Sequence, residues 1–166
     1  MWKLISGVAV LIISAASAHA QFSQLPQEPQ KVATRFGFLT VGKNRMLLFK
    51  GHKLEPPIEG NNSLNLGAIY HTGPDDIVLA MDNGGSACPF LYYFITVNKD
   101  GARATKAFGT CAELSNIKRF GDSISIRMPG FLGPFEPVAK RRAAARQRHN
   151  LVFSRGVVTE NGKRVE

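Results

Sequence analysis

Long apolar runs are almost missing from this chain of 166 residues. The one clear run, Leu4 to Ala16, is about 13 residues long and falls short of the ~20 that a membrane-spanning helix needs. It follows Met1-Trp2-Lys3 and precedes Ala18-His19-Ala20, a pattern of small residues typical of signal-peptide cleavage. We therefore expect a signal peptide over residues 1–20, cleaved after Ala20, no transmembrane segment, and a periplasmic or secreted protein.

Cysteine is scarce as well, since only Cys88 and Cys111 occur. An even pair in an exported chain most simply forms one structural disulfide. Closing a loop of this length is worth roughly 3 kcal/mol. The alternative is a redox-active or nucleophilic thiol, but the chain has no Cys-x-x-Cys motif and neither cysteine has a histidine beside it in sequence.

Recognisable catalytic and metal-binding motifs are also lacking. After removal of the signal peptide, His52, His71 and His149 stand far apart without ligand spacing, which predicts no metal site. The segment Gly84–Pro89 lacks the Gly-Lys-Ser/Thr ending of a phosphate-binding loop, and Ser86 does not sit in a Gly-x-Ser-x-Gly motif. The sequence therefore predicts neither an enzyme nor a cofactor.

Acidic residues are few relative to basic ones. The full chain has 21 Lys+Arg and 12 Asp+Glu, and the signal peptide removes only Lys3, so the mature chain carries 20 − 12 = +8. This surplus favours anionic partners such as acidic glycans or lipopolysaccharide, whereas export argues against nucleic acid. The alternative is a basic protein that has no anionic partner.

What the chain does contain is a β pattern. Residues 21–34 are polar, with regularly spaced glutamines and two prolines, and predict a flexible arm. From Arg35 onward, short apolar runs alternate with Asn-Gly and Asp-Gly turn signals, which predicts an antiparallel β domain over 35–166, as a sandwich or a curved sheet. The expected strands and turns follow in order: Phe36–Val41, a turn at Gly42-Lys43-Asn44, Met46–Lys50, Ile77–Met81, Phe90–Val97, Ala104–Phe108, Ser123–Met128, Leu151–Phe153, Val157-Val158, and a last hairpin at Glu160–Lys163.

The centre of the domain is expected around the two cysteines. The run Phe90–Val97 is apolar on both faces and predicts a central strand, whereas Ser123–Met128 alternates and predicts a strand with one wet face. Cys88 precedes the central strand and Cys111 follows the short strand expected at Ala104–Phe108. The disulfide would then join the start of the central strand to the end of its hairpin partner.

One helix is expected near the C-terminus, from Val138 to Gln147, after a proline-rich start at Pro134–Pro137. It would carry most of a basic cluster without acids: Lys140, Arg141, Arg142, Arg146 and Arg148. At 100° per residue, Arg142 and Arg146 share one side, Arg141 and Arg148 a second, and Lys140 a third. Guanidinium groups bind phosphate or sulfate through paired hydrogen bonds, so the cluster predicts an anion site. The alternative is a solvated helix covering an edge of the sheet; the alanines between the charges argue against an interfacial membrane helix.

Three motifs carry a resemblance: Gly84–Pro89 with Tyr92, Phe108-Gly109-Thr110-Cys111, and Asn161-Gly162-Lys163. Together they make the stretch from Ile77 to Lys163 resemble a group of small exported proteobacterial proteins of unknown function. The resemblance implies bacterial export and brings no catalytic or ligand-binding residue with it.

The leading hypothesis is a non-enzymatic binding protein that engages an anionic envelope or host component through Lys140–Arg148. A second hypothesis is a small envelope enzyme with His52, His71 or Asp76 as general acid–base; it requires a pocket that joins at least two of these side chains. A third is a structural or inhibitory module that caps another protein with a sheet edge, which requires an accessible apolar patch or strand edge.

Overall fold

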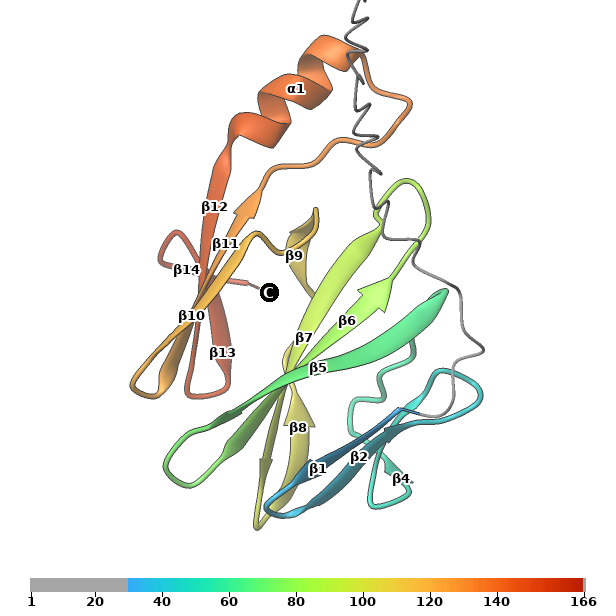
Figure 1. Ribbon diagram of the computed structural model, residues 1–166, viewed down its shortest axis with the longest axis vertical. Coiled ribbons are helices and arrows are strands. Elements are labelled where there is room, and N and C mark those ends of the chain that lie inside the picture. The colour runs from blue at the N-terminus through green and yellow to red at the C-terminus, as the bar shows by residue number, and fades with distance from the viewer. Residues whose placement is uncertain (1–29, 166) are drawn as a thin grey trace, which may run out of the picture.

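A computed structural model describes residues 30–165 as three antiparallel sheets that follow one another along the chain (Figure 1). The N-terminal sheet contains β1 (Lys31–Thr34), β2 (Gly37–Val41), β3 (Leu47–Phe49) and β4 (His52–Lys53). The central sheet contains β5 (Ser63–His71), β6 (Asp76–Asn83), β7 (Phe90–Asn98), β8 (Gly101–Ala104) and β9 (Phe108–Cys111). The C-terminal sheet contains β10 (Asn116–Phe120), β11 (Ser123–Pro129), β12 (Arg148–Ser154), β13 (Val157–Glu160) and β14 (Lys163–Arg164), with α1 (Val138–Arg146) between β11 and β12. The expected mainly β class with one short C-terminal helix is confirmed.

The central sheet is buried on both faces, which explains its continuous apolar runs. In β6, Ile77 and Leu79 point into a core shared with the C-terminal sheet, and Val78 and Ala80 point into a second core shared with the N-terminal sheet. Antiparallel sheets usually keep one wet face, and their strands then alternate apolar and polar residues. Here successive side chains of one strand point to opposite faces of the sheet and pack into two separate cores.

Strand β7 lies at the centre of this arrangement, as its sequence predicts. Phe94 stacks on Phe108 with ring centroids 5.1 Å apart, and its ring lies 4.5 Å from that of Phe153 in the C-terminal sheet. On the opposite face, Ile95 and Val97 are fully buried against the N-terminal sheet. Burying one such side chain is worth about 1.5–3 kcal/mol, so β7 anchors both cores.

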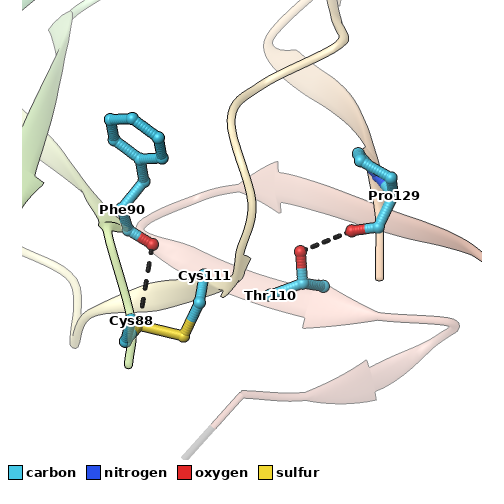
Figure 2. Close-up of a disulfide and its surroundings, with 5 residues drawn as sticks. All are labelled: Cys88, Phe90, Thr110, Cys111 and Pro129. Carbon is cyan, nitrogen blue, oxygen red and sulfur yellow. Dashed lines mark hydrogen bonds between the residues drawn. A yellow bond between two sulfur atoms is a disulfide. The ribbon is translucent and has the colours of Figure 1, made fainter. Parts of the chain in front are cut away.

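The predicted disulfide between Cys88 and Cys111 is present, with the two Cα atoms 4.7 Å apart (Figure 2). It joins the residues just before β7 to the end of β9, where Cys111 lies opposite Phe90 in the ladder. Next to it, the Thr110 hydroxyl donates a hydrogen bond of 2.6 Å to the carbonyl of Pro129 on β11. The bridge therefore lies where the central and C-terminal sheets meet.

The partner of β7 differs from the single strand expected at Ala104–Phe108. The residues after β7 form two short strands instead, β8 beside its second half and β9 beside its first half. Between them, Thr105 exchanges hydrogen bonds with the backbone of Phe94 through its hydroxyl and its amide. The Thr105 side chain thus takes the place of a backbone acceptor between β8 and β9. Hydrophobic periodicity does not reveal such a break in a strand.

The arm expected over residues 21–34 overlaps the N-terminal sheet. Its last four residues form β1, paired with β2, and the side chain of Gln30 bonds the side chain of Asn65 and the backbone amide of Leu66 on β5. Val32 packs on the second core but is only partly buried. The sequence of β1, Lys-Val-Ala-Thr, therefore lacks the strong alternation of apolar and polar residues that would predict a strand. The remainder of the arm and the predicted signal peptide, 1–20, lie outside the described residues.

Candidate anion-binding site

The basic helix α1 lies beyond the ends of β11 and β12, in the connection between them (Figure 1). Pro137 occupies the position before its first turn, and Ala144 is its only buried residue. It comes close to the chain at Gly130, directly after β11, where an added Cβ would lie 2.6 Å from the carbonyl oxygen of Ala144. The helix is therefore held by its C-terminal half, and most of its surface faces solvent.

Two of the five predicted anion-binding residues contact the segment before the helix. The Arg141 Nε donates to the carbonyl of Glu136 at 3.1 Å, and the Lys140 ammonium lies 3.9 Å from the Glu136 carboxylate. An exposed ion pair of this kind is worth less than about 1 kcal/mol. Both cations therefore retain most of their capacity to bind an external anion.

Arg148 is the first residue of β12 and does not extend the helix, contrary to the prediction that it shares a helix side with Arg141. The helix ends at Arg146, and Gln147 adopts an extended backbone conformation with ψ of 151°. The Arg148 guanidinium donates to the carbonyls of Ala145 and Gln147 at 2.9 and 3.0 Å. Such carbonyls lack partners within a helix, so Arg148 closes the C-terminal end of α1.

Arg142 and Arg146 lie one helical turn apart and share one side, as predicted. Both are exposed, and neither side chain makes a hydrogen bond or ion pair with any residue in the described range 30–165. Acidic residues are also absent from the sequence between Pro137 and Thr159. These two guanidinium groups are thus adjacent, uncompensated and open to solvent, which suits paired hydrogen bonds to an oxyanion.

The residues of the enzyme hypothesis are brought together only in part. His71 Nδ1 lies 2.7 Å from Asp76 Oδ1, so the imidazole donates to this carboxylate, whereas His52 lies exposed on β4 in a different sheet. Asp76 is fully buried and also accepts hydrogen bonds from the amide and the Nε of Arg35, at 2.6 and 2.7 Å. Burial raises the pKa of Asp76, but these hydrogen bonds and the charge of Arg35 outweigh it and hold that pKa below its ordinary value.

Arg35 connects this carboxylate to the turn between β5 and β6. Its guanidinium donates to the carbonyls of Thr72 and Asp75 at 2.9 and 2.7 Å. All these contacts join the β1–β2 turn to the central sheet, so the cluster holds two layers together. Sequence reasoning missed Arg35, because nothing in its local pattern marks it as the partner of a carboxylate 41 residues later.

A cleft of about 580 Å³ opens between the β7–β8 hairpin and the β12–β13 turn. Its charged lining residues are Asp75, Asp100, Arg103 and Arg155, and it includes neither His71 nor Asp76. Asp100 is paired with Lys99, and Asp75 accepts a hydrogen bond from Asn98. The acid and base residues of the enzyme hypothesis therefore do not meet in this cleft.

Residues 30–165 contain neither a metal-binding cluster nor a membrane-spanning helix. That part of the chain contains no group of three or more His, Cys, Asp or Glu placed to hold a metal ion. Nor does any helix there have the length and apolar character needed to cross a membrane.

Comparison with known proteins adds no relative: no family model matches the chain, and no curated protein or solved structure is significantly similar to it. The resemblance to small exported proteobacterial proteins stays a prediction.

Proposed function

We propose that this protein is an exported, non-enzymatic binding protein that engages an anionic component of the cell envelope or of a host through Lys140–Arg148. The observation that carries the proposal is the pair Arg142 and Arg146, which are exposed on one side of a helix and whose side chains have no hydrogen-bond or ion-pair partner in the described part of the chain. Two like charges one turn apart repel each other unless a counter-charge is supplied. An external anion would supply it.

The position of the helix supports this function. Arg148 and the close approach at Gly130 fix the C-terminal half of α1, while the charged side chains stand clear of the sheets. Binding of an anion would therefore require little reorganisation of the protein. The net charge of +8 expected for the mature chain would also speed the approach of an anionic partner at low ionic strength.

The disulfide supports export to a periplasmic or extracellular location. Bridges such as Cys88–Cys111 persist in oxidising compartments, whereas cytosolic thiols are kept reduced. The predicted signal peptide, cleaved after Ala20, is the sequence feature that agrees with this location.

The test is retention of the purified protein on immobilised envelope fractions over a series of NaCl concentrations. We expect elution at moderate salt for the wild type and earlier elution for Arg142→Ala/Arg146→Ala, because screening and charge removal weaken the same contacts. The matched control Lys43→Ala/Lys53→Ala removes two exposed positive charges far from α1 in sequence and should elute like the wild type. Equal retention of the Arg142→Ala/Arg146→Ala variant and the wild type would contradict the proposal.

A protein partner is the second candidate, because Phe135, three residues before the start of α1, is 91% exposed and Val138, the first residue of α1, is 52% exposed. A large aromatic side chain so open to solvent suits a protein interface. This candidate predicts capture of one partner that resists high salt and is lost in Phe135→Ser. Salt-sensitive retention that Phe135→Ser leaves unchanged would contradict it.

A further inference from the structure

The outer face of the C-terminal sheet carries a second basic surface, separate from the helix. The inner face of this sheet packs on the central sheet through residues such as Ile126, Leu151 and Phe153. Residues on the opposite face alternate with these along each strand. Every charged residue that β10–β14 place on this outer face is basic: Lys118, Arg127, Arg148 and Arg164.

A shallow groove of about 180 Å³ lies on this face, between β10 and β11. It is lined by Asn116, Lys118, Phe120, Ser125 and Arg127, all of which belong to the outer face by register. Sites for drug-sized ligands usually occupy about 300–1,000 Å³. The groove therefore suits one ring-sized unit of a longer molecule better than a whole small ligand.

The two cations of the groove have no ion-pair partner among residues 30–165. Arg127 lies opposite Asn116, and Lys118 lies opposite Ser125, which makes the two basic residues diagonal neighbours across the ladder. Neither side chain makes a hydrogen bond or ion pair with another residue of the described chain. Diagonal neighbours on one face lie about 7–8 Å apart, within reach of long side chains, so one anion could contact both cations.

The other groups of the groove favour a sugar. Phe120 is 64% exposed, and its ring offers an apolar surface at the end of a row of polar side chains. Asn116 and Ser125 provide an amide and a hydroxyl, which match the hydroxyl groups of a carbohydrate. A membrane-binding face would instead need several bulky apolar residues around the charges.

The groove lies between β10 and β11, and the helix connects β11 to β12, so both adjoin β11. Arg148 is opposite Pro129, and two residues further along the same face Asn150 is opposite Arg127. Arg148 also closes the end of α1, so it links the basic helix to the basic sheet face. A linear polymer could contact both surfaces.

We infer that the outer face of β10–β14 binds an acidic polysaccharide, with one sugar ring in the groove beside Phe120 and its carboxylate or sulfate between Lys118 and Arg127. This inference rests on the proposed function and specifies its ligand. The polysaccharide chain continues past Arg148 to Arg142 and Arg146 on α1.

The test measures binding of the full protein to polygalacturonate by calorimetry, with neutral dextran as the uncharged control. We expect Lys118→Ala/Arg127→Ala to lower the affinity about tenfold, from the loss of two charge-assisted contacts. Phe120→Ala should lower it about threefold, and this loss should persist at high salt because it is not electrostatic. Lys43→Ala/Lys53→Ala is the control, and equal thermal midpoints show that the variants are folded.

The outcomes separate this inference from the proposed function. Polygalacturonate binding that depends on Arg142 and Arg146 but is unchanged in Lys118→Ala/Arg127→Ala or in Phe120→Ala overturns the inference and leaves the function in place. The inference is also overturned, and the proposed function kept, if Arg142 and Arg146 bind only vesicles of phosphatidylethanolamine and phosphatidylglycerol (3:1) or only a single-stranded oligonucleotide. Absence of salt-sensitive binding to every anionic probe overturns both.

Discussion

The Nε of Arg35, in the turn between β1 and β2, lies 2.7 Å from the carboxylate of Asp76, which is fully buried at the start of β6. This contact spans two sheets and 41 positions of sequence. It places a negative charge inside the protein only because three donors surround it: the amide and guanidinium of Arg35 and the imidazole of His71. The pair holds the N-terminal sheet against the central sheet.

Removal of Asp76 should therefore be costly. We expect Asp76→Ala to lower the free energy of unfolding by about 2–3 kcal/mol, below the usual cost of breaking a fully buried pair because Arg35 remains partly exposed. Urea unfolding measures this loss. The double variant with Arg35→Ala should lose less than the sum of the two single variants. Simple additivity would show that the two side chains do not act together.

The same pair predicts a dependence of stability on pH. The pKa of Asp76 is lowered by folding, so its contribution is complete above the unfolded pKa of about 3.9 and is lost as the pH falls through the folded value. Stability measured between pH 5 and pH 2 should fall less steeply for Asp76→Asn than for the wild type. Parallel curves for the two proteins would contradict this role for the carboxylate.

The disulfide should stabilise the fold without being part of the binding site. Cys88 and Cys111 are separated by 23 positions, and in Cys88→Ser/Cys111→Ser we expect a loss of about 3 kcal/mol in the free energy of unfolding. Native material should show no free thiol on alkylation and mass spectrometry. Salt-sensitive binding should survive in the fraction of this variant that remains folded. Two alkylated thiols in native material would contradict the structural role.

Gly130 should control the position of the basic helix. A Cβ there would lie 2.6 Å from the Ala144 carbonyl oxygen, a backbone atom that can move only if the helix moves. We expect Gly130→Ala to increase amide hydrogen exchange in α1 while the exchange of β6 and β7 stays slow. Unchanged exchange across 138–146 would mean that this contact does not hold the helix.

The local sequence pattern was sufficient to predict those turns, strands and helices that depend on a few neighbouring residues. The turn at Gly42-Lys43-Asn44, the central strand around Phe94, the hairpin at Glu160–Lys163 and the helix from Val138 were all predicted, because turn residues and apolar runs act over a few positions. The disulfide was predicted from the pairing of two cysteines alone.

Contacts between sheets were not predictable in this way. The apolar run of β7 predicts burial on both faces, but not that two different sheets supply the two cores. Arg35 and Asp76 meet through the stacking of layers, and Lys118 and Arg127 become neighbours only through the register of β10 with β11. Arg148 was likewise assigned to the same side of the helix as Arg141, because nothing in the sequence marks the extended backbone at Gln147.

The central claim is that Arg142 and Arg146 bind an external anion, and nuclear magnetic resonance of the arginine side chains tests it most directly. The Nε–Hε resonances of the intact protein are followed while dextran sulfate is added, with neutral dextran as the control. The account predicts that the resonances of Arg142 and Arg146 shift with dextran sulfate, return with added NaCl, and do not move with dextran. Shifts confined to arginines outside 140–148 would contradict it.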